Sequence, residues 1–137
     1  MNIKRIETFD DSIGEFINEE FSQYGEKSGL ALNYDDFCFV AENKDGQITG
    51  VITGHAYYNE VHISNLIIKA GCRRNGLGKK LVETVEETYS GKEYEKITVS
   101  TYGFQAPEFY QKLGYTVEFI RDDKEPKLRK YFLSKPI

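Results

Sequence analysis

The feature that most constrains the fold is one continuous stretch between residues 61 and 89. An apolar run ending in Leu66-Ile67-Ile68 leads into a glycine-rich turn, and the turn leads into a sequence with helical periodicity. A nearly continuous apolar run is typical of a strand that is covered on both faces. The helical part repeats its apolar positions at residues 77, 81, 82, 85 and 89, which places them on one face. The stretch therefore predicts a buried strand, a tight turn and an amphipathic helix.

The rest of the chain alternates between helical and β-strand patterns. Strands are expected at 3–6, 36–41, 47–57, 61–69, 94–102, 115–121 and 128–133, and helices at 10–24, 77–89 and 106–113. Asp45-Gly46 is a favoured hairpin turn, and Gly50 and Gly54 inside the next strand indicate a bulge or a close backbone approach. This order mixes hairpins with βαβ crossovers. It predicts an α/β (mixed α+β) fold, a single domain over 1–137 with a twisted, mixed, mostly antiparallel sheet of about seven strands and flanking helices.

Composition excludes several classes of protein. Apolar residues make up 39% of the 137 residues, which can bury a core and excludes general disorder. No apolar run approaches the ~20 residues of a membrane-spanning helix, and the first ten residues lack the apolar centre of a secretory signal, so we expect a cytoplasmic protein with no membrane partner. Cys38 and Cys72 have no metal-ligand spacing, so we expect reduced thiols, Cys38 buried, and no metal. The net charge of −4 disfavours a nucleic-acid partner.

The glycine-rich turn has the chemistry of an anion site. Arg73, Arg74, Lys79 and Lys80 bring four cations into an otherwise acidic chain. The first turn of a helix offers unpaired N–H donors and the positive end of the macrodipole, and glycines let a ligand approach the backbone. A glycine pair alone more often only shapes a tight turn. The surrounding pattern therefore has to decide between the two interpretations.

Two familiar phosphate loops do not fit this turn. A Walker A loop needs Lys after its second glycine, and here Leu77 follows Gly76. A dinucleotide fingerprint needs a third glycine where Leu81 stands. The pattern that does fit is Arg73-x-x-Gly76-x-Gly78.

This pattern resembles motif A of the GNAT N-acetyltransferase superfamily, Gln/Arg-x-x-Gly-x-Gly/Ala. Downstream, the run from Ala106 to Tyr115 is similar to that family's motif B, Ala-x-x-Phe-Tyr-x-x-Leu-Gly-Phe/Tyr. A helix and a strand separate the two motifs, as in the family. Three positions depart from it: Gly103 replaces a frequent Asn, Ala70 a frequent Pro, and Ser64-Asn65 a common mid-strand carboxylate.

The resemblance implies an acetyl-CoA cleft where the motif A and motif B strands splay apart. Backbone N–H groups from Arg73 or Arg74 through Lys79 would hold the pyrophosphate. The strand end from Leu66 to Ile68 would pair its backbone with the pantetheine amides, and an N–H near Ile68 would stabilise negative charge on the thioester oxygen. The side chains of Leu66 and Ile67 are expected in the core. The implied cofactor-binding residues are Leu66, Ile67, Ile68, Arg73, Arg74, Asn75, Gly76, Leu77, Gly78 and Lys79.

The resemblance also implies an N-acetyltransferase that moves the acetyl group to a primary amine by direct attack on the thioester. Tyr110 occupies the position of the general acid that protonates the departing thiolate. Glu60 is the first candidate for the base, His55 and His62 are others, and a water relay or prior loss of the proton needs no base. The acceptor is a small-molecule or peptide amine, and a homodimer stays open.

Two other functions remain as alternatives. The chain could be an acyl-CoA-binding regulatory or interaction module with little transferase activity, because the mid-strand carboxylate is absent. A nucleic-acid module built on the four cations of the turn is disfavoured by the net negative charge and by the lack of interleaved aromatic residues.

Overall fold

The structure is a computed structural model that describes the whole chain, Met1–Ile137. It contains two compact units, Met1–Asn33 and Tyr34–Ile137. The first unit holds helix α1 (Asp11–Lys27), which begins after Asp10, as expected, and the Asp10 carboxylate accepts a hydrogen bond from the N–H of Ile13 at 3.2 Å. The expected strand at 3–6 does not form. An isolated strand leaves its N–H and C=O groups unpaired, and these residues have no neighbouring strand to pair with.

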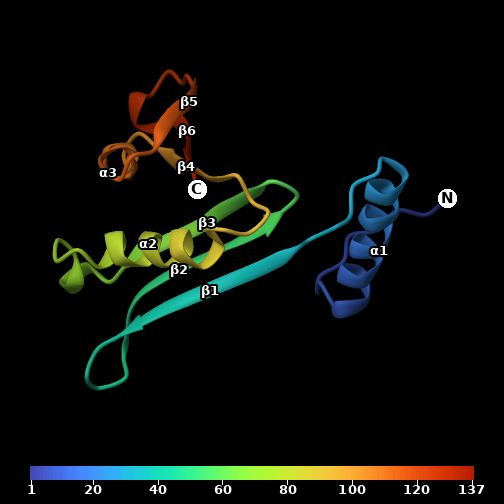
Figure 1. The fold of residues 1–137 in the computed structure, drawn as a ribbon, viewed down its shortest axis with the longest axis horizontal. Helices are drawn as coiled ribbons and strands as arrows, with labels where there is room; N and C mark the ends of the chain where they lie inside the picture. The colour runs from blue at the N-terminus through green and yellow to red at the C-terminus, as the bar shows by residue number, and fades with distance from the viewer. The chain divides into compact units, whose positions relative to one another are not determined.

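The second unit is built on a sheet of six strands, one fewer than the seven or so expected. Its strands are β1 (Asp35–Glu42), β2 (Ile48–Tyr57), β3 (Glu60–Ile68), β4 (Lys96–Tyr102), β5 (Thr116–Arg121) and β6 (Lys130–Pro136). They lie in the order β1-β2-β3-β4-β6-β5 (Figure 1). The β3–β4 pair is parallel and every other pair is antiparallel, which confirms the mixed, mostly antiparallel sheet. Short 3₁₀ turns lie at Ala70–Cys72 and Pro126–Leu128.

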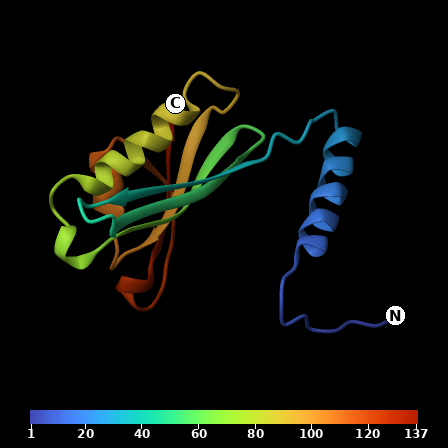
Figure 2. The same cartoon turned by 90° about the horizontal axis from the view of Figure 1, so that it is seen from below.

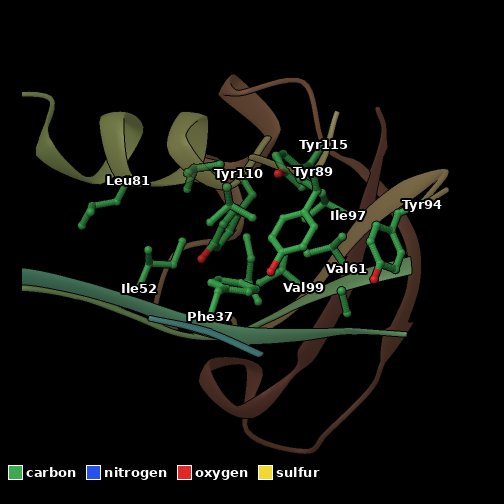
Figure 3. Close-up of a cluster of buried hydrophobic side chains, with 14 of the residues drawn as sticks. Phe37, Ile52, Val61, Leu81, Tyr89, Tyr94, Ile97, Val99, Tyr110 and Tyr115 are labelled. Atoms are coloured by element: carbon green, nitrogen blue, oxygen red, sulfur yellow. The ribbon is translucent and has the colours of Figure 1, made fainter. Parts of the chain in front are cut away.

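Helix α2 (Leu77–Tyr89) covers one face of the sheet, in contact with β1, β2 and β3 (Figures 1 and 2). Its predicted apolar stripe is confirmed, because Leu81, Val82, Val85 and Tyr89 are all buried. Helix α3 (Pro107–Lys112) contacts β5 and adds its aromatic residues to the same core. Figure 3 shows the ring of Tyr110 among these side chains, between α2 and the sheet. The core thus lies between two helices and one sheet face.

Alternation along β1 explains why one sequence expectation is wrong. Phe37 is buried, and Phe39 packs against the core. Cys38 lies between them and therefore points to the opposite face, where it is exposed rather than buried.

No cluster of three or more His, Cys, Asp or Glu side chains is placed to hold a metal ion. None of the helices has both the length and the apolar character that crossing a membrane requires.

A polar cluster fixes α2 to the last strand. The Lys135 ammonium lies 3.0 Å from Oε2 of Glu86 and donates to the Leu113 carbonyl at 2.9 Å. The Tyr115 hydroxyl donates to the same Glu86 oxygen at 3.1 Å. Because β6 pairs with β4, this cluster also sets where β4 lies relative to α2.

Both strand glycines flagged in the sequence are places of close approach. A Cβ at Gly50 would lie 2.8 Å from Cδ1 of Ile68, and one at Gly54 would collide with the His62 carbonyl oxygen and the Phe37 ring. The β2–β3 register also shifts next to Gly54, where Ser64 of β3 has no partner. The close backbone approach is therefore confirmed at both glycines, and the extra residue of the bulge lies on the partner strand, at Ser64 of β3.

Substitution of Gly54 by alanine tests this close approach. We expect Gly54→Ala to lower the free energy of unfolding by roughly 1–3 kcal/mol, because the added methyl group must displace backbone or an aromatic ring. Gly71→Ala is the matched control, since a Cβ there meets nothing within 4 Å, and it should change stability by less than about 0.5 kcal/mol. Urea unfolding of both variants measures the difference, and equal effects would contradict the packing described here.

Candidate active site

The cleft forms where β3 and β4 part. Their parallel pairing runs only from Glu60 opposite Lys96 to Ile63 opposite Val99. Beyond that point β3 pairs only with β2, and β4 only with β6. The parted strands, the loop before α2 and the start of α3 enclose a cleft of about 750 Å³. All ten residues expected to bind the cofactor line this cleft, and so does Tyr110.

The edge of β3 offers free backbone groups to the cleft. The N–H of Lys69 bonds the Thr49 carbonyl at 2.8 Å, and Ile68 lies opposite Gly50 in the register. In an antiparallel ladder this geometry makes the Ile68–Gly50 pair a non-hydrogen-bonded pair, so the N–H and C=O of Ile68 point away from β2. The same alternation applies to Leu66, two residues earlier. On that side β4 has already departed, so both residues direct their backbone groups into the cleft.

The side chains of these strand residues have a different role from their backbone. Leu66 and Ile68 pack against the core, as expected for Leu66. Ile67 points to the opposite face of the sheet and is exposed, so its side chain is not in the core as expected. The strand end is thus anchored by two side chains while its backbone faces the cleft.

The loop after β3 is held by Arg73. Its Nε donates to the Ile68 carbonyl at 2.9 Å, which ties the loop to the strand end. Arg74 has φ 68° and Gly76 has φ 82°, both in the left-handed region. Turns of this kind direct successive backbone N–H groups toward one point and make concave anion sites. A left-handed non-glycine residue is strained, which is typical of functional loops.

The N-terminus of α2 has no capping side chain. Gly76 is the N-cap, and the first intrahelical acceptor is its carbonyl, which receives the Lys80 N–H at 3.1 Å. The N–H groups of Leu77, Gly78 and Lys79 therefore have no acceptor within the helix. The first turn contains no acidic residue, and the Lys79 ammonium lies 3.8 Å from Glu83 in an exposed pair. The macrodipole and the nearby cations together favour an anion here.

Gly78 also has a packing role that the sequence did not indicate. A Cβ at this position would lie 3.2 Å from Cζ of Phe109, so the glycine lets α3 approach the first turn of α2. Phe109 in turn lines the cleft beside Tyr110.

Tyr110 is held firmly on α3. Its ring meets Tyr115 edge-on, with the ring centroids 5.6 Å apart, and only 4% of the residue is exposed. Burial raises the pKa of the Tyr110 hydroxyl to about 12. The hydroxyl therefore remains protonated throughout the neutral range and is available as a proton donor.

The far wall of the cleft was missed by the sequence analysis. It is formed by β4 and the loop into α3, with Ser100, Thr101, Phe104 and Gln105 among its residues. Thr101 Oγ1 accepts the Ala106 N–H at 3.2 Å, and Gln105 Oε1 accepts the Tyr102 N–H at 3.1 Å, so these side chains shape the loop. No local pattern marks them, because only the parting of β4 from β3 turns ordinary strand residues into a cleft wall.

The candidate bases lie outside the cleft. Glu60 is the first residue of β3 and pairs with Lys96 of β4. We call the place where the two strands part the fork, and Glu60 lies at its closed end, where they are still paired. The first lining residue is Ile63, three positions or about 10 Å farther along the strand. His62 is half-buried, and its Nδ1 lies 2.8 Å from Oγ1 of Thr98. Burial lowers the pKa of His62, and the neighbouring His55 adds to this shift.

Comparison with known proteins supplies an independent view of this arrangement. The family described as acetyltransferase (GNAT) domain matches residues 5–125. Blasticidin-S acetyltransferase from Streptomyces morookaense is 33% identical over 103 residues, covering 74% of this chain and 75% of that protein.

Solved structures agree with the sequence comparison. An acetyltransferase from Bacillus cereus ATCC 14579 has a TM-score of 0.78 at 30% identity, with 98% of both chains covered. An Elizabethkingia anophelis GNAT family acetyltransferase with acetyl-CoA bound has a TM-score of 0.64, with 93% of this chain and 85% of that chain covered. At 16% identity, the latter likeness concerns the fold alone.

Burial of Tyr110 predicts a pH dependence of stability. Its pKa is about 12 in the folded protein, above the value of about 10 in the unfolded chain. Ionisation above pH 10 therefore favours the unfolded state, and stability should fall as the pH rises from 10 toward 12. Tyr110→Phe should reduce this fall, because phenylalanine keeps the ring and cannot ionise.

Urea unfolding of both proteins at pH 8, 10 and 11 measures the effect. Other tyrosines contribute to both curves, so only the difference between the curves reports on Tyr110. Curves that stay parallel from pH 8 to pH 11 would show that the Tyr110 hydroxyl is not desolvated.

Proposed function

The chain belongs to the GNAT acetyltransferase family, and from this we propose that it transfers the acetyl group of acetyl-CoA to a primary amine of a small molecule. The observation that carries the proposal is a single cleft with two unpaired backbone surfaces, the β3 edge and the α2 N-terminus. Acetyl-CoA has an amide-containing arm and a pyrophosphate, which match these surfaces in chemistry. The family match crosses both units of the structure, which supports the proposal that residues 1–137 act as one domain.

The cofactor-binding roles follow from the free backbone groups. We assign the N–H of Ile68 and the C=O of Leu66 to the pantetheine amides, since β4 does not occupy that edge. The pyrophosphate at the loop after Ile68 leaves the acyl end of the cofactor toward Ser64, so we assign the N–H of Leu66 to the thioester oxygen. We assign the backbone from Arg73 through Lys79, including Asn75, to the pyrophosphate. Arg73 has a second role, because its Nε already holds the Ile68 carbonyl.

The chemistry supplied by acetyl-CoA is an activated acyl group on a thiolate leaving group. The amine nitrogen forms a bond to the carbonyl carbon, the carbon–sulfur bond breaks, and the thiolate needs a proton. We propose that the Tyr110 hydroxyl gives that proton, because Tyr110 lines the cleft and stays protonated at neutral pH. A thiol has a pKa of ~8.5, so the thiolate is a fair leaving group even without a proton, and a positioned donor lowers the barrier further as the charge develops on sulfur.

The proton on the attacking amine needs a different route from the one first expected. Glu60 is about 10 Å along the strand from the first cleft residue, too far for direct transfer from an amine at the thioester. We propose that the acceptor ammonium loses one proton to water before it attacks. After the carbon–nitrogen bond forms, the nitrogen loses a second proton to water, and Tyr110 regains its own proton from water as the thiol leaves. Glu60 instead takes part in acceptor binding.

A small-molecule acceptor is favoured over a peptide by the blasticidin-S acetyltransferase described above, which is 33% identical over 103 residues. That relative is named for blasticidin S, a small molecule. We therefore propose blasticidin S and simple primary amines as the first acceptors to test.

The direct test is release of CoA thiol from acetyl-CoA with these acceptors, for wild type and for Tyr110→Phe. The variant keeps the packing of the ring and deletes only the proton donor. We expect a kcat lower by roughly 10²-fold with nearly unchanged CoA affinity in calorimetry. Because the pKa of Tyr110 is about 12, the wild-type rate should show no decline from Tyr110 ionisation below pH 10.

Two outcomes would contradict parts of this proposal. If Tyr110→Phe has the same kcat as the wild type, and the chemical step limits that rate, then Tyr110 only packs in the core and does not donate the proton. Tight acetyl-CoA binding without transfer to any amine would favour the acyl-CoA-binding module instead.

A further inference from the structure

Four aromatic rings gather on the sheet face that α2 leaves uncovered, all within the unit Tyr34–Ile137. His55 and Tyr57 are alternate residues of β2 and share this face, and their rings stack with centroids 5.4 Å apart. Tyr34 stacks on both, at 6.2 Å from His55 and 6.4 Å from Tyr57. His62 lies directly opposite His55 in the register, 5.5 Å away. We call these four residues the aromatic surface.

Two carboxylates flank the aromatic surface. Asp36 lies opposite His55 across the β1–β2 ladder, and Glu60 lies opposite Tyr57 across the β2–β3 ladder, so both share its face. Their charges act on the rings: after burial, the Asp36 carboxylate is the largest cause that raises the pKa of Tyr34. The charge of Asp35 also raises the pKa of Tyr34. The cations of this region are Lys96, opposite Glu60 on β4, and Lys130 on β6, whose charge lowers the pKa of His62. Three carboxylates and two ammonium groups therefore act on the rings, which leaves the surface negative by one charge.

The aromatic surface leads directly to the fork of the cleft. His62 lies two positions before Ser64, the unpaired residue of the bulge in β3, and Ser64 lines the cleft. Its Nδ1 lies 2.8 Å from Thr98 Oγ1, and Thr98 is two positions before Ser100 on the opposite wall. The surface therefore begins about 7 Å from the bulge, and Glu60 lies about 13 Å from it.

We propose that the aromatic surface, with Asp36 and Glu60, binds a second cationic group of the acceptor while its primary amine enters the cleft. Aromatic faces attract cations through the ring quadrupole, and carboxylates add direct charge pairing. The spacing requires an acceptor whose second cation lies roughly 7–13 Å from the reacting nitrogen. The inference rests on the proposed function and narrows its substrate class to amines with a second cationic nitrogen.

A matched pair of acceptors tests the proposal. 1,6-Diaminohexane and 1-aminohexane have the same chain, and they differ only in the second ammonium. Wild type should show a kcat/KM about 10-fold higher for the diamine, well beyond the twofold statistical advantage of two amines. Asp36→Asn and Glu60→Gln should bring the ratio close to two by raising the KM of the diamine more than the KM of the monoamine. Glu87→Gln, on the exposed side of α2, is the control and should keep the full ratio.

A binding measurement keeps the test independent of turnover. With CoA present, 1,6-diaminohexane should shift the ring-proton NMR signals of His55 and His62, and 1-aminohexane should not. Similar kcat/KM values for both amines, or a ratio that Asp36→Asn and Glu60→Gln leave unchanged, would overturn the inference while leaving the acetyltransferase intact. If no amine is acetylated, the proposed function fails, and the NMR titration alone then decides whether the surface binds cations.

Discussion

The structure depends most on the place where β3 and β4 stop pairing. Up to Ile63 and Val99 the two strands form an ordinary parallel ladder, and one residue later the ladder is gone. Loss of a ladder exposes backbone donors and acceptors, which is costly in a protein interior unless something else pairs with them. In this chain the Ile68 carbonyl accepts a hydrogen bond from Nε of Arg73, and the remaining free backbone groups of the β3 edge face the cleft. The parted strands therefore create the binding surface.

Several local devices keep the fork open. The unpaired Ser64 bends β3 at the fork, and Gly54 on β2 leaves room for the backbone of β3 to approach. On the other wall, Lys135 and Tyr115 hold Glu86 of α2, so β6 and its partner β4 stay in place. The end of β3, from Leu66 to Ile68, contributes side chains to the core and backbone groups to the cleft. This division explains how an apolar strand end can face a polar ligand.

Much of this could be predicted from sequence, since the signals are local. The apolar run, the glycine-rich turn and the α2 stripe all depend on neighbours within one or two turns, and their elements appeared where expected. Gly54, a glycine inside a strand, is likewise a local signal, and it indicated the close approach of β2 to β3. The far wall could not be predicted, because Thr101 and Gln105 join the site only through the parting of distant strands. The prediction of a strand at 3–6 was wrong because a strand needs a pairing partner, which no local pattern reveals. The prediction that Cys38 is buried was wrong because the alternation of side chains along β1 places Cys38 on the exposed face.

Amide hydrogen exchange at residue resolution, followed by NMR with and without acetyl-CoA, shows directly whether the parted strands bind the cofactor. If the free backbone groups of the fork bind the cofactor, acetyl-CoA should slow exchange at Leu66 and Ile68 and at the first turn of α2, Leu77 to Lys79. The amides of β5, far from the cleft in the sheet order, should be unaffected. Unchanged exchange along the β3 edge with saturating acetyl-CoA would contradict the central claim that the parting of β3 from β4 makes the cofactor site.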